Sequence, residues 1–176
     1  IANLCEGEII QEGNAEIEIK SILIDSRRIS NPYNSVFIAV KGDRHNGHKF
    51  LLEAYQKGVR NFIVDEAVNL ATLQTAFVVK VPNTLTAFQL MAHKHRKSFN
   101  FPVIGITGSN GKTVVKEWLY QLLKEEFNIV KSPKSYNSQV GVPLSVWQVE
   151  RENDFGIFEA GISKPGEMGA LEFMIQ

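Results

Sequence analysis

The stretch Val103-Ile104-Gly105-Ile106-Thr107-Gly108-Ser109-Asn110-Gly111-Lys112-Thr113 decides the fold class of this 176-residue chain. Its first five residues form the apolar run of a buried strand, and a glycine-bearing turn follows. After the turn, apolar residues recur at i, i+3 and i+4 spacing, at positions 115, 118, 119, 122 and 123. Strand, glycine-rich turn and helix in this order predict a phosphate-binding loop in an α/β domain.

The residue types of this turn suit phosphate chemistry. Glycines let backbone N–H groups converge on phosphate oxygens, and the helix N-terminus adds the positive end of its dipole. We expect a nucleotide to be bound by Gly108, Ser109, Asn110, Gly111, Lys112 and Thr113. Lys112 would reach the outer phosphates as a catalytic charge, and the Thr113 hydroxyl would ligate Mg²⁺. The alternative is an ordinary strand-to-helix turn that happens to contain Gly-Lys-Thr.

Composition excludes several classes of protein. Hydrophobic residues make up 44% and charged residues 22% of the chain, which suits a globular core. Nineteen basic and nineteen acidic residues give a net charge of zero, which disfavours a nucleic-acid partner. No apolar run approaches the roughly 18 residues of a membrane span. With one cysteine, Cys5, the chain is expected to be a soluble cytoplasmic protein without a membrane partner.

The first half of the chain reads as a compact α/β unit. We expect strands in an alternating stretch from Ile17 to Ile24 and in the runs 36–40, 62–64 and 77–81. A helical pattern from Phe50 ends at Gly58, and Asn83 is a good N-cap for a second helix that ends in the cationic run 93–97. Those cations are expected to complement the helix dipole. Because a new α/β pattern starts after Pro102, we predict two domains, residues 1–98 and 99–176.

The loop Thr107–Thr113 resembles the T-G-[ST]-x-G-K-T loop of the Mur ligases, ATP-dependent amide-forming enzymes of peptidoglycan synthesis. In the general P-loop pattern the first glycine would stand at Ile106; here it stands at Gly108, as it does in this family. The resemblance implies ATP and Mg²⁺ as cofactors. It also implies a small N-terminal α/β domain that binds a UDP-linked substrate, followed by the start of a parallel-sheet ATP-binding domain.

Two further stretches of the second half resemble the same family. Residues 134–143 resemble its N-x-N-N-x-x-G-x-P stretch, which implies a catalytic Asn137 near the nucleotide phosphates; the next asparagine of the pattern is Ser138 here. Residues 155–168 resemble a strand followed by E-[LM]-G-x-x-x-x-G-E-[IM], which implies a catalytic, metal-ligating Glu159. Without the family, a solvated strand-end glutamate is an equal alternative. Lys164 stands where many relatives have histidine.

The N-terminal half carries the motifs of the substrate pocket. Asp25-Ser26-Arg27 resembles the D-[ST]-R motif that contacts UDP, although on its own it is more typical of a surface turn with an Asp–Arg pair. The run 36–48 resembles F-[VI]-A-[LV]-x-G…D-G-H, which adds three substrate-binding residues, Lys41, Gly42 and His48. His45 and His48 are too few to predict a metal site, because no third ligand lies near them in sequence.

Gly141-Val142-Pro143 favours the branch of the family that adds D-alanyl-D-alanine to UDP-N-acetylmuramoyl-tripeptide through an acyl phosphate. Residues 135–139 and 159–163 are similar to a branch fused to alanine racemase. Only three strands fit after Pro102, so we expect an N-terminal fragment, monomeric and inactive alone. The alternatives are a sister ligase that adds another amino acid, a non-catalytic UDP-sugar or nucleotide-binding module, and a generic P-loop phosphotransferase.

Overall fold

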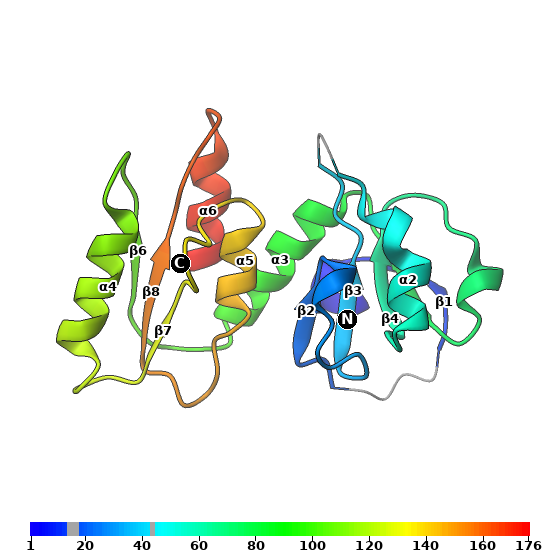
Figure 1. Cartoon of the computed structure of the whole chain (residues 1–176), viewed down its shortest axis with the longest axis horizontal. Coiled ribbons are helices and arrows are strands. Elements are labelled where there is room, and N and C mark those ends of the chain that lie inside the picture. The colour runs from blue at the N-terminus through cyan, green and yellow to red at the C-terminus, as the bar shows by residue number, and fades with distance from the viewer. Residues whose placement is uncertain (14–17, 43–44) are drawn as a thin grey trace. The chain divides into compact units, whose positions relative to one another are not determined.

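The computed structural model describes residues 1–13, 18–42 and 45–176, and it confirms the α/β class, with one mixed and one parallel sheet (Figure 1). Contacts divide the chain into two compact units, Ile1–Phe88 and Gln89–Gln176. This division falls within the helix α3 (Thr84–Arg96), whereas the sequence predicts the domain boundary just after that helix. Ile17 of the expected alternating stretch, and Asp43 and Arg44 of the loop with the substrate motif, lie outside the described residues.

The first unit is built on a five-stranded sheet in the order β1-β5-β4-β3-β2. Its strands are β1 (Glu8–Gln11), β2 (Ser21–Leu23), β3 (Ser35–Ile38), β4 (Asn61–Val64) and β5 (Phe77–Lys80). Strands β2 to β5 run parallel, and β3 and β4 are buried at every position. Parallel strands covered on both faces read as continuous apolar runs, which is why the sequence predicts them well.

The helices of this unit are more numerous than the two that the sequence predicts. They are α1 (Ala2–Cys5), η1 (Ser26–Arg28), η2 (Gly47–Phe50), α2 (Leu51–Gln56) and η3 (Leu70–Leu73), besides α3. Asn83 caps α3 by accepting a hydrogen bond from Thr86 N at 2.9 Å. Gly58, just past α2, has φ +99°, a conformation that glycine adopts without a Cβ penalty. Both predictions are therefore confirmed.

Strand β1 is not predicted from the sequence. It pairs antiparallel with β5 at the edge of the sheet, with a register shift between Ile9 and Gln11. The side chain of Gln11 donates to the carbonyls of Leu73 and Ala76, at 2.5 and 2.8 Å. A four-residue segment with two exposed positions shows too little hydrophobic periodicity to be recognised from sequence. Its extended conformation depends on the pairing with β5.

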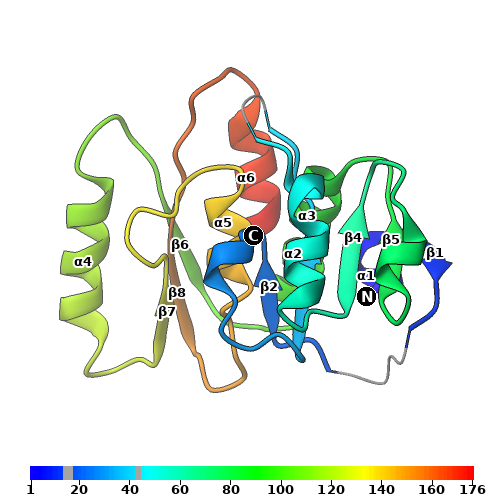
Figure 2. The same cartoon turned by 45° about the vertical axis from the view of Figure 1, so that its right-hand side comes forward.

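The second unit has a parallel three-stranded sheet in the order β6-β8-β7, which confirms the three strands expected after Pro102. Its elements are β6 (Val103–Ile106), α4 (Lys112–Leu123), β7 (Ile129–Lys131), α5 (Gly141–Val146), β8 (Phe155–Glu159) and α6 (Glu167–Ile175). Figures 1 and 2 show α4 on one face of this sheet and α5 and α6 on the other. Val146, Phe158 and Leu171 lie in the core between them.

Helix α4 confirms the helix predicted after the glycine-rich turn, but its two faces are unusual. Trp118 is 65% exposed and Leu122 75% exposed on its outer face. The face toward the sheet carries Lys116, which is fully buried. The apolar periodicity thus locates the helix correctly, while the buried side includes a charged residue.

The cationic end of α3 does more than complement the helix dipole. The Arg96 side chain is buried and donates to the carbonyls of Phe99 and Phe101, both at 2.8 Å, and of Ile175 at 3.2 Å. One guanidinium therefore ties the segment before β6 and the end of α6 to α3.

Among the helices of the described residues, none has both the length and the apolar character that a membrane span requires.

Candidate active site

The glycine-rich turn lies open at the carboxyl end of β6. Gly108 and Gly111 have φ values of +140° and +80°, and Gly111 is the N-cap of α4. Residues 107–111 are exposed. The first N–H groups of a helix have no partner within the helix, so this turn presents backbone donors to an anion. Lys112 Nζ donates to Gly108 O at 2.6 Å, which keeps the ammonium over the same turn.

Glu159 lies beside this loop because of the strand order. In the β6–β8 pairing Ile106 stands opposite Glu159, so the end of β8 adjoins the start of the turn. The Thr113 hydroxyl donates to Glu159 Oε2 at 3.1 Å. Two hard oxygen donors this close are the kind that Mg²⁺ prefers, so the residues fit the metal that the family resemblance implies. A solvated strand-end carboxylate, the alternative from sequence, does not describe Glu159, which is fully buried.

Sequence reasoning missed Lys116. Its Nζ lies 2.9 Å from Glu159 Oε1, an atom that accepts no hydrogen bond from the described residues, so the contact is an ion pair. The same ammonium donates to Ser132 O at 2.8 Å and to Lys134 O. The signal in the sequence is a lysine four places after Lys112, on the helix side that faces the sheet. Its partner Glu159 lies far along the chain, so the pair could not be recognised from spacing.

Asn137 and Lys112 line one cavity of about 330 Å³ in the second unit. Its other lining residues are Ser138, Gln139, Val140, Gly161, Ile162, Ser163 and Glu167. Gly161 N donates to Asn137 O at 2.7 Å, and a Cβ on Gly161 would lie 3.0 Å from Asn137 Cγ. The cavity therefore brings together the phosphate loop, the Asn137 stretch and the loop after β8.

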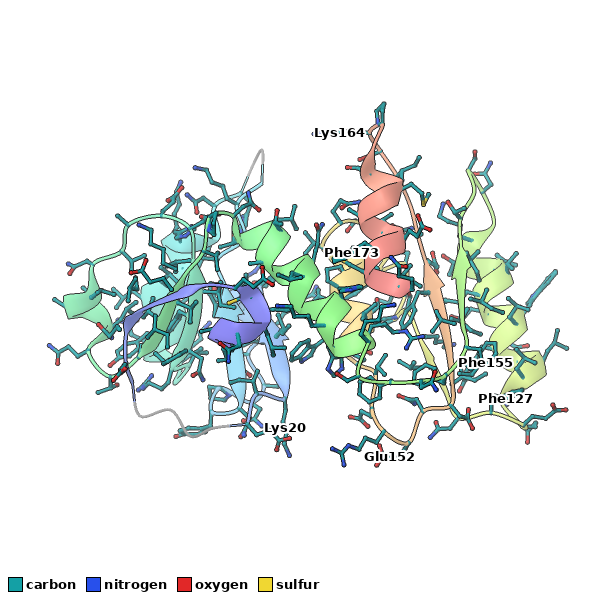
Figure 3. All side chains as sticks on the ribbon, turned by 180° about the vertical axis from the view of Figure 1, so that it is seen from behind. Lys20, Phe127, Glu152, Phe155, Lys164 and Phe173 are labelled. Atoms are coloured by element: carbon teal, nitrogen blue, oxygen red, sulfur yellow. The ribbon has the colours of Figure 1, made fainter. Side chains whose placement is uncertain are left out.

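The loop between β8 and α6 is closed by Glu167. Its carboxylate accepts from the backbone N–H of Ser163 at 2.6 Å and of Lys164 at 3.0 Å, and these bonds lower the pKa of Glu167. Figure 3 shows Lys164 at the tip of this loop and Phe173 on α6. Glu167, in the motif Gly166-Glu167-Met168, thus lines the cavity and fixes the loop that forms one side of it.

In the first unit, the substrate motif at 25–27 forms a capped turn. Asp25 caps η1 by accepting from Arg27 N, and the Arg27 guanidinium makes two bonds to the same carboxylate at 2.9 and 2.8 Å. These bonds lower the pKa of Asp25 to about 2. Ser26 Oγ donates to Glu53 Oε2 at 3.0 Å and links the turn to α2. The predicted substrate role of this motif stays a prediction.

The second substrate stretch follows β3. Lys41 Nζ pairs with Glu66 Oε1 at 2.7 Å, and this bond raises the pKa of Lys41 and lowers that of Glu66. Gly42 exchanges backbone hydrogen bonds with His45. Because β2, β3 and β4 are parallel neighbours, Asp25, Lys41 and Glu66 all follow carboxyl ends of strands at one edge of the sheet.

His48 uses both ring nitrogens inside the protein. Nδ1 lies 2.8 Å from Asn46 Oδ1, and Nε2 accepts from the backbone N–H groups of Asp65 and Glu66 at 3.2 and 3.3 Å. Nε2 is therefore the unprotonated nitrogen, and burial lowers the pKa of His48. His48, Asp65 and Glu66 are close enough to suggest a metal site, but the Nε2 lone pair already faces two donors. Through these hydrogen bonds His48 links the segment at Asn46, after β3, to the segment at Asp65 and Glu66, after β4.

Comparisons with known proteins agree with the motifs. The family described as "Mur ligase family, catalytic domain" matches residues 18–99, and "Mur ligase middle domain" matches residues 106–176. The UDP-N-acetylmuramoyl-tripeptide–D-alanyl-D-alanine ligase of Bacillus subtilis is 30% identical over 171 residues, which cover 97% of this chain and 37% of that enzyme. The ligase of the same name from Treponema pallidum is 37% identical over 158 residues, covering 85% and 34%.

Solved structures agree with both units. A crystal structure of MurF from Acinetobacter baumannii matches with a TM-score of 0.89 and 25% identity, over 98% of this chain and 37% of that one. The MurF ligase of Thermotoga maritima, solved in complex with ADP, matches with a TM-score of 0.75 and 29% identity, over 89% and 35%. The chain thus spans about a third of the length of these relatives. With both halves matched and the loop motifs in place, the chain belongs to the Mur ligase family.

Proposed function

We propose that this chain supplies the UDP-substrate and nucleotide sites of an ATP-dependent ligase that adds D-alanyl-D-alanine to UDP-N-acetylmuramoyl-tripeptide. Residues 1–98 are the UDP-substrate domain of this proposal, and residues 99–176 are the first part of the central ATP-binding domain. The observation that carries it is the open glycine turn beside the Thr113–Glu159 pair, with Asn137 and Lys112 on one cavity. The relatives named for this reaction, and the one solved with ADP, support the assignment.

In this proposal the substrate carboxylate attacks the γ-phosphorus of ATP, which releases ADP and leaves an acyl phosphate. The amine of D-alanyl-D-alanine then attacks the acyl carbon, and phosphate leaves. Phosphorylation is needed because a bare carboxylate has no good leaving group. The protein's part is alignment and charge neutralisation.

Each site residue has a physical role in that scheme. The N–H groups of residues 108–111 cradle the phosphates, and Lys112 swings from the Gly108 carbonyl to the outer phosphates. Asn137 lines the cavity in which the acyl group would lie. Thr113 and Glu159 would hold Mg²⁺, directly or through water, and the ion would neutralise phosphate charge when bound.

Calorimetric titration of the chain with ADP and Mg²⁺ tests the nucleotide site. Binding should be lost or weakened by about ten- to a hundredfold in Lys112→Ala, the cost of one charge-assisted hydrogen bond. Lys124→Ala, an exposed lysine at the other end of α4, is the matched control and should bind normally. A folded wild-type chain that does not bind ADP contradicts the proposal.

Titration with UDP-N-acetylmuramoyl-tripeptide and the corresponding dipeptide tests the substrate site and its branch. Tighter binding of the tripeptide, weakened in Arg27→Ala, is the expected result. A preference for the dipeptide would indicate a sister ligase that adds the preceding residue.

A further inference from the structure

Lys116 is a buried cation that the nucleotide site described above does not itself use. Its side chain is 0% exposed, and it leaves α4 one turn after Thr113. Lysine is almost never fully buried unless it is paired, because its ammonium loses hydration there. A leucine at this position would fill the space against the sheet without that cost. We therefore expect the ammonium of Lys116 to have a role besides packing.

The contacts of Lys116 join three separate segments. Two of its N–H donors bond to the carbonyls of Ser132 and Lys134, in the loop that follows β7. The ammonium also pairs with Glu159 Oε1 at the end of β8 and lies 3.3 Å from Glu117 Oε1 on its own helix. An ammonium has three donors and no acceptor; here two of them bond to carbonyls, and the carboxylates offset its charge.

This arrangement fixes the orientation of the Glu159 carboxylate. Oε1 faces Lys116 at 2.9 Å, and Oε2 accepts the hydrogen bond of Thr113. Each oxygen thus has a different partner, both of them on α4. The backbone N–H of Glu159 in turn donates to Ser132 Oγ at 3.0 Å.

The same arrangement also fixes the loop that carries Asn137. Lys134 has φ +51°, in the left-handed region that residues with a Cβ rarely adopt, and its carbonyl accepts from Lys116. Three residues later the chain reaches Asn137 and the cavity that it shares with Lys112. A bond to a buried cation stabilises this uncommon backbone conformation.

We propose that Lys116 is the positioning residue of the nucleotide site: its ammonium holds Glu159 and the 132–137 loop in register with the phosphate loop. The effect of Lys116 on Mg²⁺ binding through Glu159 rests on the proposed function. The anchoring of the loop rests only on the hydrogen bonds from Lys116 to Ser132 and Lys134. Lys116 touches no reacting atom and acts through Glu159 and Asn137.

Hydrogen exchange on the whole chain tests the loop anchoring. In Lys116→Met the amides of residues 132–140 should exchange about tenfold faster, the effect of losing hydrogen bonds to a charged group. Lys124→Met, on the exposed end of the same helix, should leave them unchanged. Unchanged exchange in Lys116→Met, or an equal rise throughout residues 89–176, would overturn the proposal.

Because Lys116→Met leaves the buried Glu159 carboxylate without its cationic partner, it can unfold the unit. The neutral double variant Lys116→Met/Glu159→Gln removes that charge, and its 132–140 amides should still exchange faster. Protection equal to wild type in a folded double variant would overturn the anchoring.

Chemical restoration of the charge separates positioning from packing. In a Cys5→Ala background, the Lys116→Cys side chain is alkylated in the unfolded chain with an aminoethyl or a propyl group, and the chain is refolded. The two products have nearly the same size, and only the first carries an ammonium. The increase in ADP affinity on adding Mg²⁺ should be about tenfold larger in the aminoethyl product, with equal affinities in EDTA.

Equal Mg²⁺ effects in the two products would overturn the Mg²⁺-linked part of the role of Lys116. A wild-type chain that binds no ADP would contradict the proposed function instead, and the exchange experiment would still decide the anchoring of the loop.

Discussion

Thr113 donates a hydrogen bond to Glu159 Oε2 at 3.1 Å, although 46 residues separate the two in sequence. The pairing of β6 with β8 brings them together, because it sets Ile106, just before the turn, opposite Glu159. With its hydrogen directed to the buried carboxylate, the hydroxyl turns its lone pairs away from Glu159. This geometry makes Thr113 the accessible member of the pair.

Thr113→Val should therefore remove the Mg²⁺-dependent part of nucleotide binding. Valine keeps the shape of threonine but lacks the oxygen, so ADP affinity in Mg²⁺ should fall about tenfold, the effect of one lost polar contact. Affinity in EDTA should stay unchanged. Titration calorimetry measures both, and Thr113→Ser, which keeps the hydroxyl, should retain the wild-type values. An equal loss in EDTA would mean that the variant disturbs the loop itself.

Gly161→Ala should displace the Asn137 side chain. The new Cβ would lie 3.0 Å from Asn137 Cγ, so the amide must move within the cavity. We expect the affinity for ADP, measured by titration calorimetry, to fall about tenfold, the effect of losing one hydrogen bond. Gly169→Ala is the control, because a Cβ there has nothing within 4 Å and lies in α6. It should stabilise the chain by about 0.5–1 kcal/mol, measured by thermal unfolding, with no change in binding.

Arg96→Met should destabilise the second unit. It leaves the carbonyls of Phe99, Phe101 and Ile175 without their guanidinium donor, at a cost of about 3 kcal/mol. Urea unfolding checks this value. Arg96→Lys should recover only part of the loss, because an ammonium lacks the planar fork that reaches three carbonyls. Lys97→Met, an exposed neighbour, should change stability by less than about 0.5 kcal/mol.

Arg27→Ala should raise the pKa of Asp25 from about 2 toward its ordinary 3.8, because the Arg27 side chain is the main cause of the shift. The folded pKa lies below the unfolded one, so the pair stabilises the protein above pH 3.8 and this effect is lost as pH falls toward 2. Carboxyl chemical shifts in an NMR titration report the pKa directly. Arg28→Ala, whose Nε lies 3.9 Å from the same carboxylate, should give a smaller change.

His48 should remain neutral at pH 7, with its proton on Nδ1. Burial lowers its folded pKa below the ordinary 6.5, so the unfolded chain binds more protons below that pH. Stability therefore falls as pH drops through 6.5, and this part of the loss should be absent in His48→Gln. Imidazole ¹⁵N shifts and urea unfolding at pH 5 and 7 measure the two effects. A protonated Nε2 at pH 7 would contradict the hydrogen-bond pattern.

The sequence by itself determined the features that neighbouring residues control. Residues a few positions apart predict the strand before the turn, the helix after it, the Asn83 cap of α3 and the glycine after α2. The family resemblance reached further and predicted site roles for Asn137 and Glu159, which no local rule links to the loop. The structure then brings Asn137 to the cavity of Lys112, and Glu159 to Thr113.

Only the tertiary structure decided which charged groups are buried and what they bond. Lys116 and Arg96 lie in stretches where a surface position is the ordinary expectation for a cation, yet both are buried. Strand β1 exists because β5 offers it an edge. Each case depends on a partner far along the chain, which is Glu159 for Lys116, Ile175 for Arg96 and β5 for β1, so these contacts rather than local propensity decide where the segments lie.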